Sequence, residues 1–141
     1  MLIIFGVIKN MKYNDIYKGL IELLKKSYSP YSNYPVAAYV DTDIGLIPGV
    51  NVENGSLGLT SCAERNAIFN AITNGAKVFK TVYVITKNNG DIGSPCGACR
   101  QVVSEFLKKD AKVVVFNNDG TYKEYSVEQL LPFGWDPNVS L

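Results

Sequence analysis

The spacing of apolar residues predicts a helix and then a hairpin in the first third of the chain. From Asn14 onward apolar residues recur every three to four positions, which predicts a helix that Asn14 or Asp15 caps and that ends before Pro30. Apolar, β-branched runs follow at residues 35–40 and 44–50. A polar, turn-like stretch separates the two runs, so we expect an antiparallel pair of strands.

Helices and strands then alternate. We expect a helix over residues 62–74, a buried strand at 82–86 and a helix that Ser94 and Pro95 begin and that runs to about residue 109. The remaining expected elements are a strand at 113–116, a short edge strand at 122–125 and a small helix that opens at Ser126. Strand–helix–strand units form parallel crossovers, whereas the early hairpin is antiparallel. The pattern therefore predicts an α/β fold, a three-layer α/β/α sandwich around a mixed sheet of about five strands.

Length and charge narrow the classes of function. With 141 residues the chain has the size of one domain, and we expect residues 11–141 to form it, with residues 1–10 as an N-terminal extension. The apolar start lacks a basic leader and is too short to span a bilayer, so we expect no membrane partner. The 14 Lys and Arg nearly balance 13 Asp and Glu. No basic stripe for nucleic acid is present, which favours a small-molecule ligand.

The cysteine count indicates reduced thiols. The chain has 3 Cys and no His, and an odd number cannot complete a disulfide framework. We therefore expect a cytoplasmic protein. Cys62 stands at the start of one predicted central helix, and Cys96 and Cys99 stand at the start of the other.

This placement of the thiols predicts a catalytic zinc site. Helix N-termini stabilise negative charge and thereby favour the thiolate form that zinc requires. Three thiolates from Cys62, Cys96 and Cys99 would leave one position of a tetrahedral metal for water, as catalytic zinc sites do. We predict one zinc ion per subunit.

Two charged residues complete the predicted centre. Glu64 follows Cys62 by two positions, so its carboxylate can approach a water on the metal and carry protons. We expect Arg65 to donate to a thiolate and offset excess negative charge, and Arg100 is a second candidate for that role. Zinc deaminases share this pattern of three ligands, a Glu that is not a ligand, and a Pro-Cys-x-x-Cys element.

Less specific interpretations fit parts of the pattern. Ser61 and Glu64 have the spacing of a capping box that merely begins a helix. Cys96 and Cys99 have the spacing of a redox pair, or of half a structural zinc site with a carboxylate as fourth ligand. The redox interpretation leaves Cys62 and Glu64 unexplained, and a capping box leaves Cys62 unexplained. We therefore favour the catalytic site.

The motifs resemble those of a known family. Cys62-Ala63-Glu64-Arg65 and Pro95-Cys96-Gly97-Ala98-Cys99-Arg100-Gln101 are similar to the small, all-cysteine branch of the cytidine deaminases. The similarity extends from residues 28–32 through 51–54 to 130–132. The resemblance implies hydrolytic deamination of free cytidine, and of deoxycytidine, to uridine or deoxyuridine and ammonia. In that reaction zinc-bound hydroxide would attack the base and Glu64 would act as the proton shuttle. The biological role of the protein would be pyrimidine salvage.

The resemblance also implies binding residues and an assembly. Asn51 and Glu53 would hold the ribose, and Tyr34 would pack on the pyrimidine. The family forms homotetramers with shared active sites, to which Phe133 or Trp135 would contribute. Considered alone, residues 51–54 also fit a polar turn, and Tyr34 also fits a core aromatic residue.

This sequence departs from the family pattern at three positions. Tyr34 stands where the family usually has Phe, Ala37 where it has Gly, and Leu57 where an aromatic residue is common. These departures affect how the pyrimidine ring would be bound and do not affect the metal chemistry. The alternative functions are deamination of a related aminonucleoside, a polynucleotide deaminase, or a structural zinc-binding module without turnover.

Overall fold

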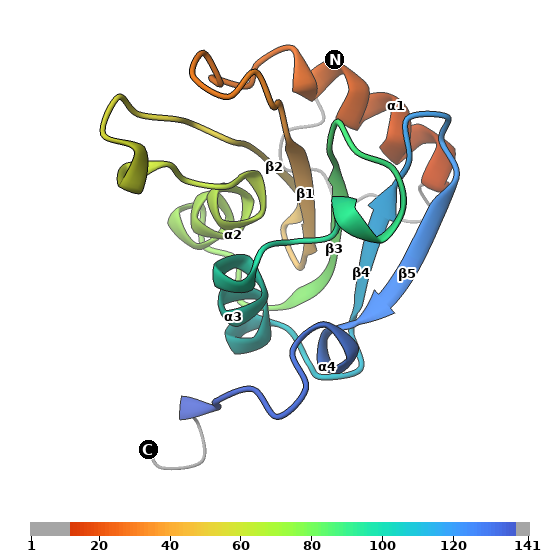
Figure 1. Cartoon of the computed structure of the whole chain (residues 1–141). Coiled ribbons are helices and arrows are strands. Elements are labelled where there is room, and N and C mark those ends of the chain that lie inside the picture. The colour runs from red at the N-terminus through yellow and green to blue at the C-terminus, as the bar shows by residue number, and fades with distance from the viewer. Residues whose placement is uncertain (1–11, 138–141) are drawn as a thin grey trace.

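The computed structural model describes residues 12–137 of the chain, which form a mixed five-stranded sheet in the order β2-β1-β3-β4-β5 (Figure 1). The predicted extension, residues 1–10, lies outside the described residues. The strands are β1 Ala37–Thr42, β2 Gly45–Val50, β3 Phe79–Ile85, β4 Lys112–Phe116 and β5 Tyr122–Ser126. The helices are α1 Tyr13–Leu24, α2 Ala63–Thr73, α3 Gly97–Phe106 and α4 Val127–Leu130, with 3-10 turns η1 Leu57–Leu59 and η2 Gly90–Gly93.

Strand directions confirm the predicted mixed sheet. β1 pairs antiparallel with both β2 and β3, while β3 and β4, which α3 connects, are parallel. β5 pairs antiparallel with β4 at the sheet edge, as expected for residues 122–125. The α/β class and the hairpin are therefore confirmed, although β1 continues through Thr42, which the sequence analysis placed in the turn.

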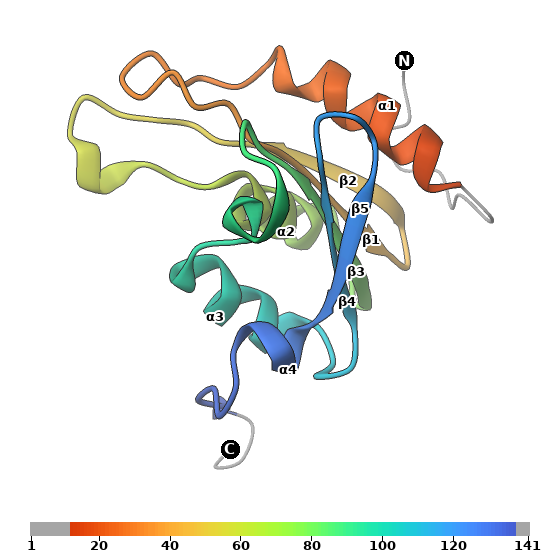
Figure 2. The ribbon, with the colours of Figure 1, turned by 45° about the vertical axis from the view of Figure 1, so that its right-hand side comes forward.

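Helices cover both faces of the sheet, as Figure 2 shows. On one face α1 packs Ile16 and Leu20 against alternate strand residues such as Tyr39. On the other face α2, α3 and α4 cover a second cluster that includes Ala38 and Val113. This confirms the three-layer arrangement. No helix within residues 12–137 has the length and apolar character needed to cross a membrane.

Three helix boundaries differ from their predictions. α1 begins after Lys12 and has no side-chain cap, so neither Asn14 nor Asp15 caps it. Cys96, not Ser94, occupies the N-cap of α3, and the hydroxyl of Ser94 accepts a hydrogen bond from the Arg100 side chain. α3 ends at Phe106, three residues earlier than expected, because Leu107 is extended.

A glycine lets α2 lie directly on the neighbouring strand. A Cβ at Gly49 would lie 2.3 Å from the backbone nitrogen of Ala67 and 2.4 Å from the carbonyl oxygen of Ala63. Asn66 adds a polar contact, because its Nδ2 donates to the carbonyl of Val50 at 2.7 Å. Close packing thus fixes the N-terminal end of α2 against β2.

Candidate metal centre and nucleoside site

The three cysteines lie together at the N-terminal ends of α2 and α3. Cys62 is the N-cap residue of α2, Cys96 is that of α3, and Cys99 lies in the first turn of α3. Their Sγ atoms all lie within 4.8 Å of one another, and those of Cys62 and Cys96 are 3.8 Å apart. The two helices bring together residues that are more than thirty positions apart in the sequence.

This cluster fits a zinc ion. Tetrahedral zinc with Zn–S bonds of about 2.3 Å holds its sulfur ligands about 3.8 Å from one another. The Sγ atoms of Cys62 and Cys96 already have that separation. Among residues 12–137, these cysteines form the one group of His, Cys, Asp or Glu side chains close enough to hold a metal. The donor set thus suits one zinc ion and leaves a fourth position for another ligand.

The thiols share a strongly polarised environment. Cys62 accepts a hydrogen bond from Cys99 and another from Arg65 Nη2 at 3.2 Å, and these lower the pKa of Cys62 to about 5. The pKa of Cys99 is raised, because Cys99 donates to Cys62 and is buried. One thiolate is therefore favoured even before a metal replaces the remaining protons.

The two arginines take different positions. Arg65 contacts the Cys62 sulfur, so its positive charge lies where it can offset thiolate charge. Arg100 does not. Its guanidinium donates to the carbonyl oxygens of Pro95 and Leu130 and to the hydroxyl of Ser94. The expectation that Arg100 also donates to a thiolate is not met in the structure, because the described hydrogen bonds of its guanidinium all go to these three oxygen acceptors.

Glu64 is a buried carboxyl group beside the thiols. Its side chain is 4% exposed, and Cys99 Sγ lies 3.7 Å from its Oε2. Burial raises the pKa of Glu64 to about 7. The capping-box alternative is wrong, because Cys62 is the N-cap and the hydroxyl of Ser61 instead donates to Asn66 Oδ1 at 2.6 Å. Glu64 therefore faces the cysteines from the first turn of α2.

The predicted ribose residues lie in a second network. Asn51 is buried, its Oδ1 accepts from the backbone nitrogen of Val36 at 2.9 Å and from the hydroxyl of Ser27, and its Nδ2 donates to the carbonyl of Tyr34 at 2.8 Å. These bonds fasten the loop of residues 27–36, hereafter the 27–36 loop, to the end of β2. Tyr34 itself is partly buried.

Glu53 fastens the same loop at a second point. Its Oε1 accepts from the backbone nitrogens of Tyr31 and Ser32 at 3.0 and 3.1 Å, and its Oε2 accepts from the Ser32 hydroxyl. These bonds lower the pKa of Glu53, and the bond from the Ser32 hydroxyl has the largest effect. The structure thus groups the predicted site residues in two networks: Cys62, Cys96, Cys99, Glu64 and Arg65 in one, and Asn51, Glu53 and Tyr34 in the other.

The structure also identifies residues that the sequence analysis missed. Gly49 and Asn66 set the position of α2, and Ser27 and Ser32 bond to the predicted ribose residues. A glycine inside a strand was an available signal for Gly49, since it often marks close backbone approach. The C-terminal aromatics, Phe133 and Trp135, are exposed.

The fold and the cysteine cluster define a zinc-dependent enzyme of the deaminase class. Residues 11–117 match the family model described as "Cytidine and deoxycytidylate deaminase zinc-binding region", and the chain belongs to this family. A cytidine deaminase of Mycoplasma genitalium is 38% identical over 120 residues, which cover 85% of this chain and 92% of that one. A cytidine deaminase of Sporosarcina psychrophila is 40% identical over 84% and 89% of the two chains.

A solved structure has the same fold. The crystal structure of cytidine deaminase from Burkholderia pseudomallei superposes with a TM-score of 0.82 at 38% sequence identity, covering 89% of this chain and all of that one. The comparison confirms the predicted fold class. Together with the cysteine cluster, the family match confirms zinc as the predicted cofactor.

Proposed function

We propose that this protein hydrolyses free cytidine and deoxycytidine to uridine or deoxyuridine and ammonia. The observation that carries the proposal is a buried carboxyl group, Glu64, beside three clustered thiols in a chain of the deaminase family. The near balance of charged residues supports a small nucleoside as substrate rather than a polynucleotide. Two relatives that this chain matches over about nine tenths of their length are named cytidine deaminases.

Glu64 is the proton carrier in this proposal. When bound, zinc supplies Lewis acidity that lowers the pKa of a water ligand. The Glu64 carboxylate accepts the proton that the attacking water loses, donates it to ring nitrogen 3, and then carries a proton to the departing amine. Water thus provides the new oxygen at carbon 4, and the amine leaves as ammonia. Burial keeps the carboxyl group away from bulk solvent during these transfers.

The second network supports nucleoside binding. In the contacts among the described residues, both lone pairs of Asn51 Oδ1 are used, but Nδ2 uses one of its two N–H donors. The Glu53 carboxylate accepts three bonds and has a capacity of about four. One donor and one acceptor therefore remain, a pair suited to sugar hydroxyl groups. The Tyr34 ring would then pack on the pyrimidine.

We also propose a homotetramer with shared active sites. The exposed apolar side chains Leu57, Leu59, Phe69 and Trp135 support it, because such surface is typical of protein–protein contacts. Sedimentation of the zinc-loaded protein tests the assembly, and a stable, active monomer would contradict it.

The proposed setting is pyrimidine salvage in the cytoplasm. The three free cysteines support it, since they must stay reduced to bind zinc. Cell fractionation tests the location. Growth of a pyrimidine-requiring strain on cytidine, with and without this protein, tests the salvage role.

Ammonia release from cytidine by the zinc-loaded protein tests the function. Replacing Glu64→Ala should lower kcat/KM by at least about 10²- to 10⁴-fold, the usual contribution of a general acid or base, while zinc remains bound. Glu105→Gln is the matched control, because Glu105 is an exposed carboxylate on α3 and the variant should keep normal turnover.

Two results would contradict the proposal. Equal turnover by wild type and Glu64→Ala would show that Glu64 does not carry protons in the reaction. Zinc retained without cytidine turnover in the wild type would reject cytidine as the substrate. Other amino-substituted nucleosides would then be tested as substrates. If none reacts, the alternative of a structural zinc-binding module without turnover would be favoured.

A further inference from the structure

The connection from β3 to α3 positions one of the three cysteines, Cys96. Cys96 lies at the N-cap of α3 but makes no side-chain capping bond, and its sulfur lies 3.8 Å from that of Cys62. Cys96 is exposed, whereas the preceding Pro95 is buried. The position of the Cys96 sulfur therefore depends on how the preceding peptide is held.

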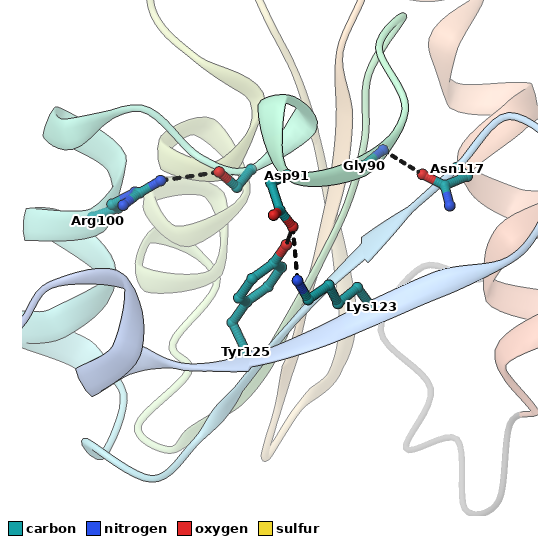
Figure 3. A network of polar contacts seen from close by, with 7 residues as sticks. Gly90, Asp91, Arg100, Asn117, Lys123 and Tyr125 are labelled. Atoms are coloured by element: carbon teal, nitrogen blue, oxygen red, sulfur yellow. Dashed lines mark hydrogen bonds and ion pairs between the residues drawn. The ribbon is translucent and has the colours of Figure 1, made fainter.

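Arg100 holds that peptide. Its Nε donates to the carbonyl oxygen of Pro95 at 2.7 Å, one Nη donates to the hydroxyl of Ser94 at 2.9 Å, and the other donates to the carbonyl oxygen of Leu130 at 2.9 Å. Figure 3 shows the Arg100 side chain beside the chain that enters α3. A single planar group thus joins the residues just before Cys96 to the end of α4.

The earlier part of the same connection has its own anchors. Asp91 Oδ1 lies 2.9 Å from Lys123 Nζ and accepts a hydrogen bond from the hydroxyl of Tyr125, both on β5 (Figure 3). The backbone nitrogen of Gly90 donates to Asn117 Oδ1 at 2.7 Å. These contacts hold the η2 turn on the sheet edge. Arg100 therefore fixes only the two residues after η2, Ser94 and Pro95, which directly precede Cys96.

We propose that Arg100 is a positioning residue for the metal centre, which holds the Pro95 peptide so that the Cys96 sulfur faces those of Cys62 and Cys99. The inference rests on the proposed zinc-dependent function. Arg100 acts through Ser94 and Pro95, in contrast to Arg65, which contacts a sulfur directly. Lysine cannot replace it fully, because an ammonium group lacks the flat fork that reaches three acceptors at once.

The rate of zinc release tests this role without relying on turnover. Zinc-loaded wild type, Arg100→Met and Arg100→Lys are mixed with a chromogenic chelator at a temperature where thermal melts show all three folded. We expect Arg100→Met to release zinc about ten- to a hundredfold faster, the usual effect of losing a partner that orients metal ligands, and Arg100→Lys to lie in between. Lys108→Met, at an exposed position just beyond α3, is the matched control and should release zinc at the wild-type rate.

A cobalt spectrum separates positioning from general stability. Replacing zinc with Co²⁺ gives sulfur-to-cobalt charge-transfer bands that report on the thiolate ligands. We expect weakened or shifted bands in Arg100→Met and unchanged bands in Lys108→Met. A merely structural role would lower the melting temperature and leave both the bands and the release rate of the folded protein unchanged.

The inference is overturned if folded Arg100→Met releases zinc at the wild-type rate with wild-type cobalt bands. Should that variant fail to fold, Arg100→Lys and Ser94→Ala decide the matter, and wild-type release by both would also overturn it. If wild type turns over cytidine and the Arg100 variants keep the wild-type rate of zinc release and the wild-type cobalt bands, only the positioning role is rejected. A wild type that binds no zinc rejects both this role and the proposed function.

Discussion

The metal centre and the 27–36 loop are built in opposite ways. In the metal centre Cys62, Cys96, Cys99 and Glu64 sit at two helix ends, and their side chains face one another. In the 27–36 loop the backbone is held from outside, by polar side chains that follow β2. One half of the site is placed by helices packed on a sheet, and the other by single hydrogen bonds.

This difference predicts different sensitivities. The metal centre should respond most to changes that move α2 or α3 as rigid bodies, because packed interiors do not deform smoothly. The 27–36 loop should respond to single polar atoms, with smaller effects on global stability, since a net hydrogen bond contributes about 1 kcal/mol. Substitutions in each half of the site test this difference.

The largest expected effect follows from Gly49→Ala. A Cβ at this position would lie within 2.4 Å of two backbone atoms of α2, which cannot move aside like a flexible side chain. We expect a loss of about 3 kcal/mol in the free energy of unfolding, at the upper end of overpacking effects. Denaturant titration of the zinc-free protein measures it, and zinc content should also fall, because α2 carries Cys62.

Gly58→Ala is the matched control for this experiment. Gly58 has open space where a Cβ would stand, and it is exposed. The variant should change stability by no more than about 0.5 kcal/mol. If Gly49→Ala were equally mild, α2 would not be held by this close approach, and the contrast between the two halves would lose its main support.

An intermediate effect is expected for Glu53→Gln, and it should depend on pH. The pKa of Glu53 is lowered in the folded protein by the Ser32 hydroxyl and by two backbone donors. A lowered folded pKa contributes stability above the unfolded value of 4.5, and the contribution is lost as the pH falls through the folded pKa. The variant should therefore melt a few degrees below wild type at neutral pH and approach it in acid.

Thermal melts at several pH values, with Glu105→Gln as control, measure this difference. The control carboxylate is exposed on α3, so its replacement should leave the pH dependence unchanged. A constant gap between wild type and Glu53→Gln at all pH values would show that the carboxylate charge does not hold the 27–36 loop. A rise in KM without any change in melting would assign Glu53 to the sugar alone.

The fold was largely predictable because its signals are local. The short apolar run of residues 35–40 predicted a strand, and in β1 Ala37 and Tyr39 lie on one face of the sheet while Ala38 and Val40 lie on the other, so apolar residues are needed on both faces. The helix ends were less predictable. Ser94 has the right residue type for an N-cap, but α3 begins two residues later than Ser94 predicts, with Cys96 as its N-cap, and the Ser94 hydroxyl accepts from the Arg100 side chain of that helix.

The two halves of the site differ in the same way. Cys62, Cys96 and Cys99 could be grouped from the sequence, because thiols at helix starts have few other uses together. The bonds that hold the 27–36 loop could not, because amide and carboxylate groups suit a sugar and a backbone equally well. Asn51 and Glu53 are 15 and 21 or more positions from the backbone groups that they bind, so spacing gives no guide.

The smallest expected effect concerns Tyr34, which in the proposed function packs on the pyrimidine. Its described bonds to the loop come from its backbone: the nitrogen donates to the Ser32 hydroxyl at 3.1 Å and the carbonyl accepts from Asn51 at 2.8 Å. The ring can therefore be changed without unfastening the 27–36 loop. Tyr34→Ala should raise the KM for cytidine about fivefold, since stacking on a base contributes about 1 kcal/mol at the low end.

Tyr34→Phe is the control for the ring itself and should keep KM within about twofold, because the aromatic face is retained. Steady-state kinetics with cytidine measure both variants, and thermal melts check that the loop is intact. If Tyr34→Ala lowered the melting temperature and left KM unchanged, the ring would belong to the core. The grip on the pyrimidine would then have to come from other residues, while the backbone of Tyr34 would still bind Ser32 and Asn51.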